Sequence, residues 1–474
     1  MPNGLCLLLG VLAAGAGAEA KDKPMAFVRV SPRDARYFEL TDGRPYVPIG
    51  LNMIQPPGKA DADRRLAEMA RWMEKLSAHG GNYIRVWLGA DYWDVEHARS
   101  GAYDEAKARR IDAMLALARK HGLRVKMTLE HFRAFFSKRS WTNKAIHHVS
   151  NGGPARDIAD FFDGEKARAQ FRAKLAWFAR RFGDRPEVFG WELWNEADCI
   201  RRGGYEAWTE IMLAELQRRF PRNLALQSYG SFDNASKSAR YRRLALMKGN
   251  DVAQVHRYLD LGARLEVCHG PVDVLAADAV RELRSYRPDR PVILAESGAV
   301  EPSHSGPFKL YAKDTAGIIL HDVLFAPFFA GAGGGGQIWH WGQYVDRNDL
   351  WWQFGRFAEA VRGIDPPAEA FRVRTVEHPR LRVYVLAGKR TVLAWCRDRR
   401  NTWRSELAEG KPPETVRGAA VDLSKVGDLP ANAAARTYDP WVRRWRDARR
   451  TGGTVALPDF QRSIVLRIEP PDAE

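Results

Sequence analysis

The feature that most constrains this sequence is a unit that recurs between residues 45 and 342. A short apolar run, rich in β-branched or aromatic residues, is followed by a polar loop and then by an amphipathic stretch. This alternation is typical of parallel strands joined by crossover helices. Eight such apolar runs occur: Tyr46–Asn52, Tyr83–Leu88, Arg124–Glu130, Val188–Glu196, Asn223–Tyr229, Val252–Tyr258, Pro291–Glu296 and Gly336–Trp341.

The stretches between these runs have helical periodicity. Asp61–His79 places four apolar residues at helical spacing, namely Leu66, Met69, Met73 and Leu76. Helices are also predicted at Glu105–His121 and Glu165–Phe182. Gly80 and Gly122 follow two of these helices, at the position where a C-cap glycine is favoured. Eight βα units in about 300 residues predict a (β/α)8 TIM barrel in the α/β class.

The flanking segments differ from the repeated unit. Phe27–Arg29 and Tyr37–Leu40 predict a hairpin, with a turn at Asp42-Gly43, that closes the bottom of the barrel. After Pro366-Pro367 the helical patterns stop, and six short alternating runs follow: Leu381–Leu386, Thr391–Trp395, Ala419–Leu423, Ala434–Tyr438, Thr454–Leu457 and Ser463–Ile468. They predict a small C-terminal antiparallel β-sandwich. We therefore expect a barrel domain over residues 21–366 and a β-sandwich domain over residues 367–474.

The N-terminus has the pattern of an export signal. Leu5–Ala14 is apolar, and Ala18-Glu19-Ala20 has the small-x-small form of a signal-peptidase site. We expect residues 1–20 to be a signal peptide and the protein to be secreted or periplasmic. The alternative is a buried N-terminal helix. Elsewhere the chain has no run of eighteen apolar residues, so no membrane association is expected after cleavage.

The net charge of +16 raises the question of nucleic-acid binding. The 74 Lys and Arg residues are scattered along the chain without a basic block, so we expect no nucleic-acid partner. Cys199, Cys268 and Cys396 are an odd number for a disulfide framework. Free thiols are favoured over a Cys199–Cys268 pair. The 16 Trp residues are more informative, because sugar-binding clefts use the flat indole face to stack on pyranose rings.

The fourth and seventh predicted strands end in candidate catalytic glutamates. The fourth run closes on Asn195-Glu196 and the seventh on Glu296. Barrel enzymes carry their catalytic groups at these strand ends. Burial at the end of an apolar strand raises the pKa of a carboxyl group toward the range of a general acid. Glu196 alone is better explained as a helix cap or as a partner of Arg201 or Arg202, and Glu296 alone has the alternative of a structural salt bridge. Together they are the pair that glycoside hydrolysis requires, one to protonate the leaving oxygen and one to attack the anomeric carbon.

Other strand ends add polar and aromatic groups. Arg85 on the second strand is suited to hold Glu296 ionised. His256 and Tyr258 lie on one side of the sixth strand, where the phenol can bond the nucleophile and the imidazole the acid. Three further candidates are His131 after the third strand and Trp339 and Trp341 on the eighth. Each of these residues also has a purely structural explanation, as an ion-pair partner or as core.

Aromatic residues also crowd the loops after the second and third strands. They either line sugar subsites or pack these loops: Trp87, Tyr92, Trp93, Phe132, Phe135, Phe136 and Trp141.

This ordered set resembles glycoside hydrolase family 5, the cellulase and mannanase family of clan A. The resemblance covers roughly residues 37–365 and implies the (β/α)8 fold. It further implies Glu196 as acid/base, Glu296 as nucleophile and Asn195 as the contact to the sugar 2-hydroxyl. Arg85, His256 and Tyr258 would support them. His131 matches the family's histidine after the third strand approximately, and either Trp339 or Trp341 matches its aromatic platform.

The sequence thus predicts a retaining glycosidase that acts on a β-linked polysaccharide or oligosaccharide of the β-mannan or β-1,4-glucan type. No metal and no cofactor are expected, since no His-x-x-x-His or Cys cluster lies at a strand end. We expect the chain to act as a monomer. The alternative is a non-catalytic carbohydrate-binding protein on a degenerate barrel, which would keep the aromatic cleft but lose one carboxylate.

Overall fold

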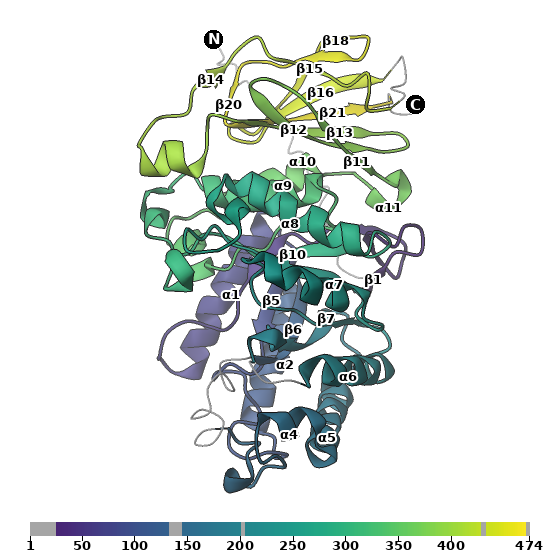
Figure 1. Ribbon diagram of the computed structural model, residues 1–474, viewed down its shortest axis with the longest axis vertical. Helices are drawn as coiled ribbons and strands as arrows, with labels where there is room; N and C mark the ends of the chain where they lie inside the picture. Colours follow the sequence, from purple (N-terminus) through teal and green to yellow (C-terminus); the bar gives the residue numbers. More distant parts are fainter. Residues whose placement is uncertain (1–24, 132–144, 201–203, 428–432, 471–474) are drawn as a thin grey trace, which may run out of the picture.

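The computed structural model describes residues 25–131, 145–200, 204–427 and 433–470. Its central part consists of short parallel strands that alternate with helices (Figure 1). The parallel strands are β4 (Gly50–Asn52), β5 (Tyr83–Trp87), β6 (Arg124–His131), β7 (Val188–Asn195), β8 (Leu224–Leu226), β9 (Ala253–His256) and β10 (Val292–Glu296). The α/β class predicted from the sequence is confirmed.

Hydrogen bonding divides these strands between two parallel sheets, β4-β5-β6-β7-β8 and β9-β10. The sheets are linked at both edges. On one side the amide of Asp251 donates to the carbonyl of Ala225 (2.9 Å). On the other, Ile338 forms isolated parallel bridges with Leu51 of β4 and with Ser297, which directly follows β10. The carboxyl ends of all seven strands therefore meet at one end of this assembly.

The eighth predicted strand, Gly336–Trp341, contributes only those bridges of Ile338. Two local features shorten it. A π-helix, Trp341–Asp346, begins where the run was expected to end. Before it, the backbone passes very close to its neighbours: a Cβ atom on Gly334 would lie 2.5 Å from Pro48, and one on Gly336 would lie 2.3 Å from the carbonyl oxygen of Val323. This crowding explains the glycine run.

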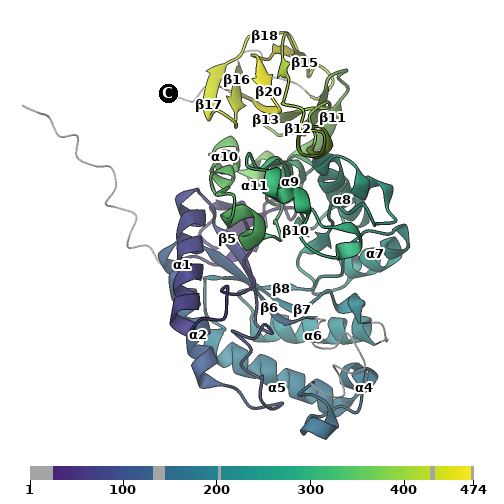
Figure 2. The ribbon, with the colours of Figure 1, turned by 90° about the vertical axis from the view of Figure 1, so that its left-hand side faces the viewer.

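The helices cover the strands (Figure 2). They are α1 (Ala62–Ala78), α2 (Glu105–Lys120), α4 (Ile158–Asp163), α5 (Glu165–Phe182), α6 (Tyr205–Arg219), α7 (Ser238–Leu246), α8 (Val272–Tyr286), α9 (Ile318–Phe329), α10 (Trp352–Ala360) and α11 (Pro366–Glu369). The three helices named from periodicity are confirmed. Gly80 and Gly122 have φ of +74° and +67°, the left-handed conformation expected of a glycine that follows a helix.

The N-terminal segment packs against the amino ends of the parallel strands. It consists of β1 (Val28–Val30), β2 (Phe38–Leu40) and β3 (Pro45–Tyr46), which pair antiparallel in that order. Phe38 and Phe189 meet edge to face, with ring centroids 5.3 Å apart. The cluster continues to Ile293 at the start of β10. This apolar cover closes the end opposite to the catalytic candidates.

The C-terminal strands form a six-stranded sheet, β11-β12-β13-β21-β16-β17, and two small sheets, β14-β20 and β15-β19-β18. All their pairings are antiparallel. Their bounds are β11 (Arg372–Val376), β12 (Leu381–Ala387), β13 (Val392–Asp398), β14 (Thr415–Val416), β15 (Ala420–Asp422), β16 (Ala434–Asp439), β17 (Arg444–Asp447), β18 (Arg450–Thr451), β19 (Thr454–Ala456), β20 (Phe460–Gln461) and β21 (Ser463–Glu469). A separate apolar cluster lies between the larger sheet and β15-β19.

Helices α8 and α9 lie between the parallel strands and the C-terminal sheets (Figures 1 and 2). All 12 residues of α9 are buried, as a helix covered on every side requires. Two buried ion pairs fix this contact: Arg397 of β13 with Asp322 of α9 (2.8 Å), and Arg382 of β12 with Asp273 of α8 (2.5 Å).

Within the described part of the chain, no helix is long and apolar enough to cross a membrane. Cys199, Cys268 and Cys396 are free thiols. The predicted signal peptide, residues 1–20, lies outside the described residues, as do Phe132, Phe135, Phe136 and Trp141.

Candidate active site

The two predicted glutamates come together at the carboxyl ends of the strands. Glu296 is the last residue of β10, and Glu196 directly follows β7. One carboxylate oxygen of each and a ring nitrogen of His256 all lie within 4.8 Å of one another. His256 Nδ1 is 2.9 Å from Glu196 Oε1 and 3.5 Å from Glu296 Oε2. The two carboxyl groups are thus close enough to act on a single bond.

Glu296 is held from two sides. The guanidinium of Arg85, on β5, donates to Oε1, and the hydroxyl of Tyr258, just after β9, donates to Oε2 (2.7 Å). Both predicted contacts are present. Arg85 also donates to the side-chain oxygen of Asn195 (2.6 Å). Because that bond fixes the amide orientation, Asn195 Nδ2 is left buried and without a partner among the described residues.

Glu196 stands in a different environment. Its φ of +56° and ψ of +50° place it in the left-handed region, a conformation that costs a non-glycine residue on the order of 1–3 kcal/mol and clusters at active sites. Burial, followed by the negative charge of Asp198, raises the pKa of Glu196 to about 7. Burial also lowers the pKa of His256 to about 4, which keeps the adjacent imidazole neutral at neutral pH. The Glu196 carboxyl group therefore holds a proton that it can donate.

The aromatic candidates lie near these carboxyl groups but do not bond them. His131 does not bond either glutamate in the described structure; its Nε2 is 3.1 Å from the carbonyl oxygen of Gly89, and its ring stacks on Trp87 (5.3 Å). Trp339 contacts the same Trp87 ring (5.1 Å). Trp341 meets Trp339 edge to face, since the segment turns into a π-helix instead of continuing as a strand. These rings form one aromatic group beside the site.

Two of the loop aromatics pack the loop and do not face a cleft. Tyr92 is 2% exposed and Trp93 is fully buried. Their rings meet edge to face at 4.5 Å, and the Trp93 indole donates to the carbonyl oxygen of Ile54 (3.1 Å). The structural explanation of these residues is therefore the right one.

Two charged residues near the site were not predicted, because they lie within strands and not at strand ends. They are Lys126 on β6 and Glu192 on β7. Both side chains are fully buried, and they form an ion pair at 2.9 Å. Glu192 also accepts from Arg85 and from Ser228 Oγ (3.0 Å). A lysine and a glutamate in the middle of apolar runs were the available signal, because a buried charge needs a partner.

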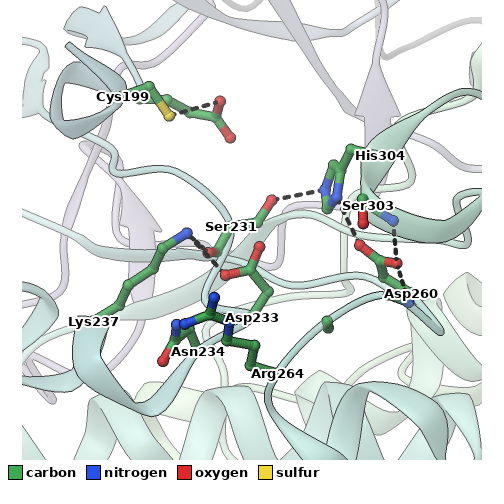
Figure 3. A pocket seen from close by; sticks show the side chains of 12 residues that line it. Cys199, Ser231, Asp233, Asn234, Lys237, Asp260, Arg264, Ser303 and His304 are labelled. Carbon is green, nitrogen blue, oxygen red and sulfur yellow. Dashed lines mark hydrogen bonds and ion pairs between the residues drawn. The ribbon is translucent and has the colours of Figure 1, made fainter. Parts of the chain in front are cut away.

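A pocket of about 420 Å³ is lined in part by Glu196 (Figure 3). Asp260 Oδ2 pairs there with His304 (2.9 Å), and Asp233 pairs with Lys237 (2.9 Å). It is lined by Glu196, Cys199, Ser231, Asp233, Asn234, Lys237, Asp260, Gly262, Ala263, Arg264, Ser303 and His304. These residues follow β7, β8, β9 and β10. Apart from Glu196, none of these residues was predicted to belong to the site.

Two groups of described residues have the ligand chemistry of a divalent cation: Glu196 with His256 and Glu296, and Glu96 with Glu130 and His147. In each group a cationic side chain already contacts a carboxylate, Arg85 in the first and Lys174 in the second. In each group a cation of the protein thus already offsets part of the negative charge.

Comparison with known proteins places the chain among glycoside hydrolases. It is 25% identical over 383 residues to mannan endo-1,4-β-mannosidase 3 of Oryza sativa subsp. japonica, a match over 73% of this chain and 77% of the relative. Mannan endo-1,4-β-mannosidase 4 of the same plant is 26% identical over 226 residues, which is 41% of this chain and 47% of the relative. No protein-family model matches the chain.

A solved structure described as a glycoside hydrolase shares the fold, with a TM-score of 0.61 and 14% identity over 95% of this chain and 98% of that one. In this chain two carboxyl groups and an imidazole meet at the strand ends of that fold. The chain is therefore an O-glycosyl hydrolase that is similar in sequence to mannan endo-1,4-β-mannosidases.

Proposed function

We propose that this protein hydrolyses β-1,4-mannan by a retaining double displacement, with Glu296 as nucleophile and Glu196 as acid/base. The approach of the two carboxyl groups to within 4.8 Å carries the proposal. Retaining glycosidases hold these groups roughly 5–5.5 Å apart, whereas inverting enzymes need roughly 6.5–9.5 Å to admit a water molecule. The substrate class follows the names of the sequence relatives.

In the first step Glu296 attacks the anomeric carbon while Glu196 donates its proton to the leaving oxygen. Arg85 and Tyr258 hold the Glu296 carboxylate in place for that attack. In the second step Glu196, now ionised, takes a proton from water, which displaces Glu296 and regenerates the free enzyme. The unpartnered Nδ2 of Asn195 is the donor for the sugar 2-hydroxyl.

The pocket beside Glu196 is the proposed site of the departing sugar, because the leaving oxygen must reach the acid. The aromatic group of Trp87, His131, Trp339 and Trp341 is proposed to support the reacting sugar on the other side.

The finer architecture belongs to the same proposal. We take the parallel strands with the Ile338 segment as an eight-stranded barrel and the C-terminal sheets as a β-sandwich. Export through the predicted signal peptide would place the enzyme where polymeric mannan is available.

The test is hydrolysis of β-1,4-mannan and manno-oligosaccharides. Products are separated by size, and the configuration of the first-formed product is followed by NMR. We expect the β-anomer first. Glu196→Ala should lower turnover roughly 10²–10⁴-fold, and added azide should restore it with a β-glycosyl azide as product. Glu296→Ala should abolish turnover.

The matched control is Glu187→Gln, which alters a buried glutamate at the opposite end of β7, where it pairs with Arg119. Its turnover should equal that of the parent enzyme. First release of the α-anomer, or parental turnover in either active-site variant, would overturn the proposal.

A further inference from the structure

Two opposite charges are buried behind the proposed nucleophile. Lys126 and Glu192 have no exposed side-chain surface, and Lys126 Nζ lies 2.9 Å from Glu192 Oε2. Lys126 also donates to the side-chain oxygen of Gln254, and Ser228 donates to Glu192 (3.0 Å). Buried ions are costly and usually gain nothing over apolar residues. A charged pair at this place therefore calls for a role besides stability.

The contacts of Arg85 connect this pair to the nucleophile. One terminal nitrogen of its guanidinium donates to Glu296 and the other to Glu192. Lys126, Glu192, Arg85 and Glu296 thus form a chain in which positive and negative charges alternate. With all four ionised the chain is neutral. Removing Lys126 would leave one guanidinium shared between two buried carboxylates.

We propose that Glu192 and Lys126 are positioning residues that set the charge around the nucleophile. Glu192 orients Arg85 toward Glu296, and the Lys126 ammonium neutralises Glu192 so that the charge of Arg85 remains available to Glu296. This inference rests on the proposed role of Glu296 as nucleophile.

The pKa directions agree with this arrangement. Burial acts to raise the pKa of Glu192, but Arg85 and Lys126 outweigh it and hold that pKa well below its usual value. Burial, and then the charge of Arg85, lower the pKa of Lys126 to about 7, while Glu192 and Glu296 act to raise it. The charge on Lys126 thus depends on both carboxylates.

Among the described residues, the titratable and charged groups with a contact to Glu296 are Arg85 from β5, Glu196 after β7, and His256 and Tyr258 at the end of β9. At neutral pH the imidazole is neutral, because burial lowers its pKa to about 4. The phenol is also neutral, because burial raises its pKa well above its usual value. Arg85 is therefore the fixed cation, and changes at Lys126 and Glu192 alter the charge that surrounds it.

The pH profile of kcat/KM on an aryl β-mannoside with a good leaving group tests the proposal. Such a substrate depends little on the acid, so the acidic limb reports ionisation of the nucleophile. Lys126→Met removes a positive charge, which favours the protonated carboxyl group and should move the acidic midpoint up by about 1 pH unit. Glu192→Gln removes a negative charge and should move the midpoint down by a similar amount. The double variant restores neutrality and should return to the parental midpoint.

Lys174→Met is the matched control. It also removes a buried lysine that pairs with a glutamate, Glu130, but this pair does not contact Arg85. Its midpoint should equal that of the parent. The inference is overturned if both single variants lose activity while their midpoints stay at the parental value. It is also overturned if both midpoints move in the same direction, because the pair would then have only a structural role.

Folding is checked by thermal unfolding of each variant. If one single variant does not fold, the other decides: a midpoint moved in its expected direction supports the inference, and an unmoved midpoint overturns it. Failure of the proposed function would appear separately, as an active Glu296→Ala variant, while failure of this inference leaves the parent enzyme active and retaining.

Discussion

At the scale of single residues, the site separates two chemically identical side chains by their surroundings. Glu296 contacts a guanidinium and a phenol, which stabilise a carboxylate. Glu196 is buried beside Asp198, and both effects favour its protonated form. The cation Arg85 beside Glu296 suits that residue to the role of nucleophile, and the anion Asp198 near Glu196 suits that residue to the role of acid. No difference between the two glutamates themselves is needed.

The first prediction concerns the alkaline limb of activity on oligosaccharides. Because Glu196 must be protonated and its pKa is about 7, kcat/KM should fall as the pH rises through about 7. Asp198→Asn removes the negative charge that helps to raise this pKa. The ionised form of Glu196 is then favoured, and the limb should move to lower pH by on the order of 1 unit.

The amide in that variant can still accept the bond that Asp198 receives from the backbone of Gly230 (2.6 Å). Asp112→Asn, which alters a carboxylate on α2 that pairs with Arg181, serves as the charge control and should leave the limb in place. A limb that stays or moves upward in Asp198→Asn would show that Asp198 does not tune the acid.

At the scale of elements, strand ends and helix ends decide where the functional residues lie. β7 ends at Asn195, and the left-handed conformation of Glu196 turns the chain directly into a short 3-10 helix, Ala197–Cys199. The acid is thus presented at the rim instead of continuing the strand. On the outer layer, left-handed glycines end α1 and α2 and allow the chain to return to β5 and β6.

These two glycines form a matched pair for a stability measurement. Both Gly80→Ala and Gly122→Ala force a side chain into the left-handed region, which costs roughly 1–2 kcal/mol. A Cβ atom at residue 122 would meet no heavy atom within 4 Å, whereas one at residue 80 would lie 2.9 Å from the Cβ atom of Ala358. In urea unfolding, Gly80→Ala should therefore be the more destabilising variant. Equal losses would indicate that α10 shifts freely to admit the methyl group.

At the scale of the whole molecule, the C-terminal sheets support the helices behind the site. β12 and β13 hold α8 and α9 through buried ion pairs, and His321 of α9 lies 2.8 Å from the hydroxyl of Ser463 on β21. Helix α9 directly precedes the glycine run and the segment of Trp339 and Trp341. Packing across this contact thus reaches the aromatic side of the active site.

The pair of Arg397 and Asp322 gives a test of that contact. Arg397→Met leaves the Asp322 carboxylate buried without its cation and should destabilise the fold by about 3–5 kcal/mol. Combining it with Asp322→Leu should recover much of the loss, because no buried charge then remains. Arg399→Met, at the exposed partner of Glu377, should change stability by less than about 0.5 kcal/mol. Denaturant midpoints measure all three; a similar loss in the single and double variants would show that the charge is not the cause.

The site residues that follow from the sequence are those that end apolar strands. Arg85, Asn195, Glu196, His256, Tyr258 and Glu296 were named from position alone, and the structure brings all six into contact around the two carboxyl groups. His131, the last residue of β6, was named by the same rule; its Nε2 lies 3.1 Å from the carbonyl oxygen of Gly89, and its part in the site stays a prediction.

The spacing of apolar residues and the order of the elements can be read along the chain. The sequence by itself therefore determined the alternation of strands and helices, and the strand ends at which the polar groups lie. Tertiary structure alone decided which buried charges pair: Lys126 with Glu192 and Arg397 with Asp322 join elements far apart in the chain. Tertiary structure also decided that Ile338 forms two isolated bridges instead of belonging to a strand. The eighth predicted strand is short because the glycines before it are crowded against Pro48 and Val323. A charged residue in an apolar run is expected to need a partner of opposite charge, but only the tertiary structure determines which residue that partner is.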